Sequence, residues 1–182
     1  TFNRNVASEG GALHLGGSDL TGVGPVGQML GSDALINASA FQDNQANQGQ
    51  MGLDRGGAIF VFGLSDTQDG VIARALIQQS TFQRNSATDD GGAIFSQGAL
   101  QLGLGSFIVQ NSARFGGGVV FERSCHQRCP PNVMQQRSVS DSTLRENHAD
   151  AAGGAIFASD TRLHIERSNL LANTADRGGG MA

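Results

Sequence analysis

A two-part motif that recurs six times constrains this chain of 182 residues more than any other feature of its sequence. The first part reads Phe-x-x-Asn-x-Ala, as at Phe82, Asn85 and Ala87, and Gly-Gly-Ala-Ile follows at residues 91–94. The asparagines of the six copies are Asn5, Asn44, Asn85, Asn111, Asn147 and Asn173. Repetition at this scale is typical of a repeat protein in which each copy forms one structural unit.

The spacing of the copies sets the size of that unit. Successive asparagines are 39, 41, 26, 36 and 26 residues apart, so the basic unit is 26 residues and the longer intervals contain insertions. A glycine pair in every copy argues against helical repeats, because glycine inside a helix costs about 1 kcal/mol relative to alanine. Alternating stretches such as Leu163-x-Ile165 and Leu100-x-Leu102 indicate short strands instead, about three in each unit.

Short strands and turns repeated at this interval predict an all-β chain that winds as a single-stranded parallel β-helix, a solenoid of the pectin-lyase-like kind. We expect about five coils with loop insertions, stacked like rungs. The helix should be right-handed, because parallel crossover connections almost always are.

Equivalent residues of successive coils should stack into columns along such a solenoid. One core column is expected at Leu13, Ile59, Ile94, Val119, Ile156 and Met181, and a second at Phe2, Phe41, Phe82, Phe107, Leu144 and Leu170. The six asparagines should form a ladder at a turn, where their amides bond the turn backbone and one another. A shorter hydroxyl ladder is predicted at Ser39, Ser80, Ser142 and Ser168, with Gly105 interrupting it. The paired glycines fit a turn that needs a positive φ or a close backbone approach.

The position after the aliphatic column should point to the opposite face of its strand. It holds Phe60, Phe95 and Phe157, with His14 and Val120 in the same column. Such a stripe is either a contact patch or a surface covered by the insertions, and we expect it to be covered. In the competing register the alanine and phenylalanine positions face inward and there is no stripe.

These motifs resemble the double signature, Phe-x-x-Asn and Gly-Gly-Ala-Ile, of the polymorphic outer membrane proteins, the autotransporter adhesins of chlamydiae. Similar repeats occur in other right-handed β-helix proteins. The fourth and sixth copies depart from the pattern with Gly-Gly-Gly, at residues 116–118 and 178–180. The resemblance implies a surface-exposed passenger domain that takes part in adhesion, and it transfers no catalytic residue to this chain.

Composition excludes several other classes of protein. The net charge is -4, all twelve basic residues are arginines, and there is no Trp or Tyr, so neither nucleic-acid binding nor sugar binding on Trp or Tyr platforms is expected. No apolar run approaches the length of a membrane span. We predict no cofactor and no metal.

We interpret residues 1–182 as a single β-helix segment of a longer repeat protein, whose neighbouring coils would be its partners. Insertions are expected near 16–33, 63–70 and 122–138. Insertions of a solenoid commonly lie on one face and carry binding surfaces.

The third insertion contains both cysteines of the chain, Cys125 and Cys129. A local disulfide is the preferred interpretation for an exported protein. Two free thiols are the next alternative. Metal binding with His126 is the least favoured, because a structural zinc site needs four ligands.

No catalytic constellation follows from the spacing of His14, His126, His148 and His164. Polysaccharide lyases and glycoside hydrolases on this fold gather acids on one face. Here the position before the glycine pair carries residues of alternating sign, which favours a surface charge ladder over a cleft of carboxylates. The residues of this ladder are Glu9, Arg55, Asp90 and Arg177.

Three functions are therefore compared. The first is a non-enzymatic extracellular or cell-surface repeat module, an adhesin or passenger scaffold that contacts a cell-surface or matrix protein or a glycan. It would be secreted, and associated with the outer membrane if it is autotransporter-like. The alternatives are a carbohydrate-active enzyme, either a polysaccharide lyase or a glycoside hydrolase, and a structural stalk without a ligand.

Overall fold

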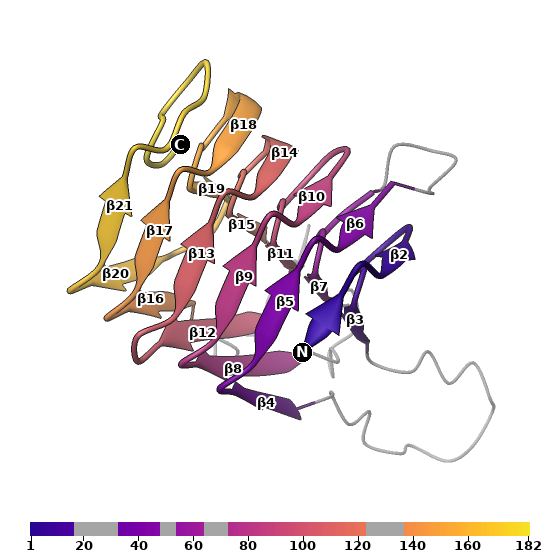
Figure 1. Cartoon of the computed structure of the whole chain (residues 1–182). Coiled ribbons are helices and arrows are strands. Elements are labelled where there is room, and N and C mark those ends of the chain that lie inside the picture. The colour runs from indigo at the N-terminus through magenta and orange to yellow at the C-terminus, as the bar shows by residue number, and fades with distance from the viewer. Residues whose placement is uncertain (17–32, 48–53, 64–72, 123–136) are drawn as a thin grey trace, which may run out of the picture.

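The computed structural model describes residues 1–16, 33–47, 54–63, 73–122 and 137–182. In these ranges the chain forms 21 strands and no helix (Figure 1). Every strand pairs in parallel with the equivalent strand of the next coil. The fold is a parallel β-helix, as the sequence predicts, with five complete coils and the first strand of a sixth.

Four sheets run along the solenoid, and each takes one strand from every coil. Sheet A contains β1 (Phe2–Asn3), β5 (Ala40–Gln42), β9 (Thr81–Gln83), β13 (Phe107–Val109), β17 (Thr143–Arg145) and β21 (Asn169–Leu171). Sheet B contains β2 (Val6–Ala7), β6 (Gln45–Ala46), β10 (Ser86–Ala87), β14 (Ser112–Phe115) and β18 (His148–Ala152). Sheet C contains β3 (Leu13–Leu15), β7 (Ile59–Val61), β11 (Ile94–Ser96), β15 (Val119–Glu122) and β19 (Ile156–Ser159). Sheet D contains β4 (Asp33–Asn37), β8 (Arg74–Gln78), β12 (Ala99–Gly103), β16 (Ser138–Ser140) and β20 (His164–Glu166).

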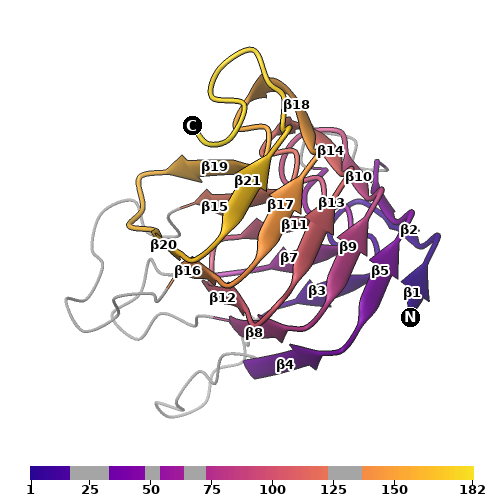
Figure 2. The same ribbon diagram turned by 60° about the vertical axis from the view of Figure 1, so that its left-hand side comes forward.

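The coils wind in the right-handed sense. In Figure 1 the strands of sheet A rise at the front, the chain returns behind them, and successive coils advance from right to left. Figure 2 shows sheets A, C and D as three sides of the winding, with sheet B continuing beyond the upper end of sheet A.

Each coil therefore has four strands, where the sequence predicts about three. The additional strand is the one in sheet B, which directly follows the asparagine and is only two residues long in β2, β6 and β10. A strand of two residues is too short to show alternation in the sequence, which is why it was missed.

The main core lies between sheets A, C and D. The aliphatic column is in register through β3, β7, β11, β15 and β19. Ile59, Ile94, Val119 and Ile156 are fully buried, Leu13 packs at the edge of the core, and Met181 on the last rung is 51% exposed.

In the second core column, Phe2 is in register with Phe41 but is 38% exposed on the first rung, and one further position differs from the prediction. Ile108, and not Phe107, pairs with Phe82 and Leu144 and is fully buried. Phe107 pairs with Thr81 and Thr143 on the outer face of sheet A and is 47% exposed. The core position lies three residues before the asparagine, whereas Phe107 lies four residues before Asn111.

The glycine pair builds a narrow neck in every coil. Gly91 has a φ of +68°, in the left-handed region where side chains are disfavoured. A Cβ on Gly92 would lie 2.1 Å from the carbonyl oxygen of Gly117 and 2.6 Å from the nitrogen of Ser112 in β14. The returning chain thus lies directly against sheet B. The neck separates the main core from a small alanine cluster in sheet B, formed by Ala46, Ala87 and Ala113.

Candidate functional site

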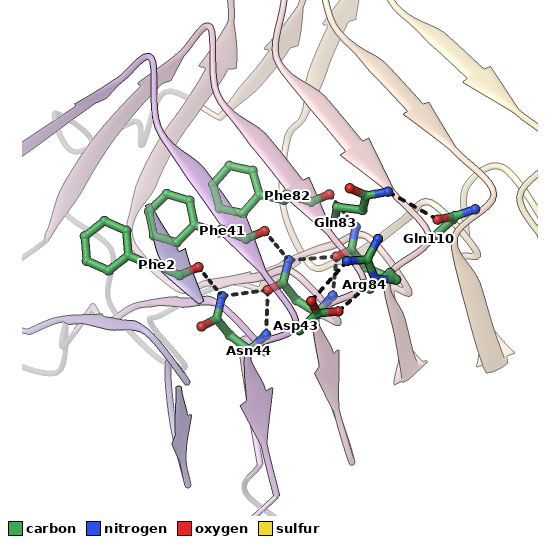
Figure 3. Close-up of polar contacts among 10 residues, drawn as sticks. Phe2, Phe41, Asp43, Asn44, Phe82, Gln83, Arg84 and Gln110 are labelled. Atoms are coloured by element: carbon green, nitrogen blue, oxygen red, sulfur yellow. Dashed lines mark hydrogen bonds and ion pairs between the residues drawn. The ribbon is translucent and has the colours of Figure 1, made fainter. Parts of the chain in front are cut away.

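The six asparagines stack at the corner between sheets A and B, each bonded to the next. Figure 3 shows Asn44 in this stack. The backbone N–H and the Nδ2 of Asn85 both donate to Oδ1 of Asn111, at 2.8 and 3.0 Å. The other hydrogen of Nδ2 goes to the carbonyl oxygen of Phe41, at 3.0 Å. The same three bonds recur at Asn44, Asn111 and Asn147. Each inner amide is buried and fully hydrogen-bonded, so these side chains hold the coils together and are not accessible to a partner.

The residue before each asparagine adopts a left-handed conformation although none is glycine, which is uncommon. We call this outward-facing set the corner column. Its members, with φ between 51° and 56°, are Arg4, Asp43, Arg84, Gln110, Glu146 and Ala172. Unlike the asparagine beside it, this position changes chemistry from coil to coil.

Charged members of the corner column pair between coils. Arg84 binds Asp43 with two hydrogen bonds, Nε to Oδ1 at 2.8 Å and Nη2 to Oδ2 at 3.0 Å (Figure 3). These bonds from Arg84, together with the charges of Arg84 and Arg4, hold the pKa of Asp43 below its usual value. Further along, Nε2 of Gln110 donates to Oε2 of Glu146 at 2.8 Å. Because these groups are exposed, each pair contributes little to stability.

The first three coils form a shallow depression at this corner, with a volume of about 570 Å³. Its lining residues are Arg4, Val6, Asp43, Gln45 and Arg84. The sequence prediction did not identify this depression, because the left-handed position that brings its charges together has no residue type of its own.

A hydroxyl ladder follows a second left-handed corner, between sheets D and A. The backbone N–H groups of Ser39, Ser80 and Ser142 donate to the hydroxyls of Ser80, Ser106 and Ser168, at 3.2, 3.3 and 3.2 Å. Ser106 thus occupies the position at which Gly105 was expected to interrupt the ladder. Gly103 pairs with Gln78. Gln78 lies two residues before Ser80, whereas Gly103 lies three residues before Ser106, so the turn of this coil contains one extra residue.

The position after the aliphatic column forms a column of its own in sheet C, and its middle members are buried. Phe60, Phe95 and Val120 are in register through sheet C and almost fully buried, in a cluster separate from the main core. Phe157 and Phe62 are partly buried against them. The column therefore faces away from the main core without offering an open apolar stripe. We call it the aromatic column below.

Residues that precede the glycine pair pack over part of the aromatic column. The guanidinium carbon of Arg55 lies 4.7 Å from the centre of the Phe95 ring, and its Nε lies 3.3 Å from Oδ2 of Asp90. Burial raises the pKa of Asp90, against the opposing charge of Arg55. The predicted charge ladder is continuous through Glu9, Arg55 and Asp90. Phe115 and Ala152 then separate these residues from Arg177.

A buried arginine is the residue that the sequence analysis missed most clearly. Arg137 directly precedes Ser138, the first residue of β16. Because Ser138 pairs with Gln101 of β12, Arg137 lies opposite the core residue Leu100. Its Nε donates to the carbonyl oxygen of Gly98 at 3.1 Å, and its Nη1 donates to the Thr161 hydroxyl. Nη2 donates to the carbonyl oxygens of Gln97 and Glu122, at 2.8 and 2.6 Å. Burial lowers the pKa of Arg137 to about 10.

The three described histidines lie apart. His14 is 3.8 Å from Glu9, His148 is 3.2 Å from Asp150, and His164 is 3.5 Å from Glu166, each between a ring nitrogen and a carboxylate oxygen. Within the described ranges, no three His, Cys, Asp or Glu side chains gather in a way that could hold a metal ion. The same part of the chain has no helix long and apolar enough to cross a membrane.

Other predictions fall on residues outside the described ranges. These are the pairing of Cys125 and Cys129, the role of His126, and most of the insertions near 16–33, 63–70 and 122–138. They stay predictions.

Comparison with known proteins gave one match. No curated protein and no solved structure matches the chain. Residues 79–97 match the model of the Chlamydia polymorphic membrane protein (Chlamydia_PMP) repeat. This segment contains β9, β10 and β11, with Phe82, Asn85 and the neck glycines of the third coil. The match confirms the resemblance drawn from the motifs: one segment of the chain, residues 79–97, is similar to the repeat of the Chlamydia polymorphic membrane protein.

Proposed function

We propose that this chain is a non-catalytic, surface-exposed repeat module, an adhesin or passenger scaffold that presents a contact surface outside the cell. The matched repeat is named for a membrane protein, which supports a location at the cell surface. Its partner would be a cell-surface or matrix protein, or a glycan.

One observation carries this proposal. The residues that define the repeat serve the fold, because the inner asparagines are buried in their ladder and Gly92 lies against backbone on two sides. The corner column beside them lies at the surface, and its residue type changes from each coil to the next. A regular scaffold with a variable outer surface is the arrangement that solenoid proteins use for binding.

The experiment is an adherence assay with the chain coupled to beads and applied to cultured epithelial cells. We expect beads carrying folded protein to adhere and beads carrying heat-unfolded protein not to adhere. Equal adherence of both would overturn the proposal, because the contact would not depend on the folded surface.

An enzymatic function rests on a single observation, the raised pKa of Asp90 with the carboxylates of Glu122 and Asp89 nearby. A raised pKa is what a general acid of a glycosidase requires. However, Asp90 is paired with Arg55, whose guanidinium group lies against the fully buried ring of Phe95. We expect no turnover of pectin, polygalacturonate or uronic-acid polymers. Turnover that disappears in Asp90→Asn would replace the proposed function.

A further inference from the structure

We propose that the corner depression of the first three coils binds the carboxylate of an acidic sugar. This inference rests on the proposed function and names the group that the exposed surface would recognise. It concerns Arg4, Val6, Asp43, Gln45 and Arg84.

The first step is the set of available donors. Arg84 uses Nε and Nη2 to hold Asp43, which leaves its Nη1 available. The side chain of Arg4 makes no hydrogen bond or ion pair within the part of the chain that the structure describes, although its charge acts on Asp43. A guanidinium group presents paired N–H donors that match the two oxygens of a carboxylate. The depression thus contains one engaged and one available guanidinium group.

The second step is the sign of the charge. The chain as a whole carries a net charge of -4, yet the depression has two arginines against one aspartate. The bond between Arg84 and Asp43 shows how this corner already holds a carboxylate. A ligand carboxylate would bind in the same manner, through Arg4 and the remaining donor of Arg84.

The third step is the choice between a sugar and a peptide. The Oε1 of Gln45 accepts a hydrogen bond from Nδ2 of Asn47 at 3.0 Å, and the Nε2 of Gln45 can donate to hydroxyl groups. Val6 supplies one small apolar contact, 47% exposed, and the other lining residues of the depression are polar or charged, so its lining offers no apolar pocket for a peptide side chain. A carboxylate, several hydroxyls and one apolar face are the features of uronic and sialic acids. The lining therefore favours an acidic saccharide over an acidic peptide.

The same geometry makes an unusual prediction about Asp43. Its carboxylate occupies the fork of Arg84 and repels an incoming anion, so it competes with the ligand. Removing the charge of Asp43 should strengthen binding, whereas removing the charge of Arg4 should weaken it.

The test is calorimetric titration of the chain with glucuronate and with N-acetylneuraminate, with methyl glucoside as the neutral sugar. We expect a Kd on the order of 1 mM for the acidic sugars, which weakens with added salt, and no binding of the neutral sugar. Arg4→Gln should weaken binding about tenfold, the effect of losing one charge-assisted contact of about 1.4 kcal/mol. Asp43→Asn should tighten it several-fold.

Two controls keep the outcome specific. Arg4→Gln places in the first coil the residue that Gln110 already provides at the same left-handed position, so the fold should be retained, and thermal unfolding checks this. Arg74→Gln removes an exposed arginine of sheet D and should leave binding unchanged.

Three results would overturn the inference: no binding of either acidic sugar, equal weakening by Arg4→Gln and Arg74→Gln, or tighter binding of an Asp- and Glu-rich peptide than of the sugars. If wild-type beads still adhere to cells when the sugars do not bind, only this inference is wrong and the proposed function stands. If the sugars bind but beads do not adhere, only the proposed function is wrong.

Discussion

The asparagine ladder and the aromatic column run along the same solenoid, but they are built in opposite ways. The ladder uses one residue type in all six copies, and its geometry is the same between every pair of inner coils. The aromatic column changes from His14 through Phe60 and Phe95 to Val120 and Phe157. One column repeats its chemistry and the other repeats only its position.

The difference follows from what each column must satisfy. A ladder of directional hydrogen bonds accepts only a side chain with one acceptor and two donors at a fixed reach, and asparagine meets this need. Apolar packing is not directional, so any side chain that fills the space is accepted if its neighbours adjust. A column with one residue type therefore indicates a geometric requirement, and a column with several residue types indicates a space that different side chains can fill.

The largest effect is expected in the aromatic column. Phe95→Ser should lower the free energy of unfolding by about 3–5 kcal/mol, because a fully buried ring is replaced by a small polar group. Urea unfolding followed by circular dichroism measures the change. A loss below about 1 kcal/mol would mean that the packing around Phe95 contributes little to stability. The aromatic column would then not be a packed second core, and its comparison with the ladder would not hold.

The ladder should be almost as sensitive. Asn85→Ala leaves the N–H and Nδ2 of Asn44 and the carbonyl oxygen of Phe41 without their partner, and we expect a loss of about 1–3 kcal/mol, near the upper end. The control is Gln110→Ala, at an exposed position of the corner column, which should stay within about 0.5 kcal/mol of wild type. Similar losses in both variants would show that the ladder adds nothing beyond the turn itself.

A third pair of variants tests the corrected register beside the ladder. Ile108→Thr places an unpaired hydroxyl in the core and should cost about 2 kcal/mol. Phe107→Thr introduces the residue that Thr81 and Thr143 provide in the neighbouring coils, and should change stability by less than about 0.5 kcal/mol. Comparison of the two urea midpoints decides the register, and the opposite order would restore Phe107 to the core.

The smallest effect concerns pH and has opposite signs in the two regions. The pKa of Asp43 is lowered by Arg84, so its contribution to stability is present above the unfolded pKa of about 3.9 and is lost as the pH falls through the lower folded value. The pKa of Asp90 is raised by burial, so its charge opposes folding at neutral pH, and this cost is relieved as the pH falls through the folded value toward about 3.9.

Unfolding of Asp43→Asn, Asp90→Asn and wild type between neutral pH and about pH 3 separates the two signs. Relative to wild type, Asp90→Asn should lack the increase in the free energy of unfolding on mild acidification. Asp43→Asn should lack the decrease in the free energy of unfolding at the acid end of the range. If both variants change the profile in the same direction, the two Arg–Asp pairs are equivalent and burial of Asp90 has no consequence.

The sequence predicts the parts of this fold that repeat. The coil number, the asparagine ladder and the aliphatic column follow from identical residues at equal positions, since each copy acts as a template for reading the others. Phe107 was misplaced because residues 107–109 are all apolar, which leaves the facing of the strand ambiguous unless it is counted back from Asn111. The place of Ser106 in the hydroxyl ladder also cannot be found by equal spacing, because the preceding turn contains one extra residue.

The candidate site was harder to foresee because it has no pattern of its own. Arg4, Asp43 and Arg84 are far apart in sequence and of mixed sign, and only the left-handed turn before each asparagine brings them side by side. Arg137 could not be recognised as buried, because its partners are backbone carbonyl oxygens that carry no signature in the sequence.

The hydrogen bonds of the asparagine ladder give the stack a direction. Toward the following coil, each inner asparagine offers two N–H donors and the core residue three positions before it offers a carbonyl oxygen, as Asn85 and Phe82 do toward Asn111. Toward the preceding coil it offers an acceptor oxygen and one N–H, as Asn85 does toward Asn44 and Phe41. The two faces of a rung fit each other, but neither fits a copy of itself. Joining of bare rungs between molecules is therefore restricted to head-to-tail order, and a head-to-head encounter would oppose donor to donor.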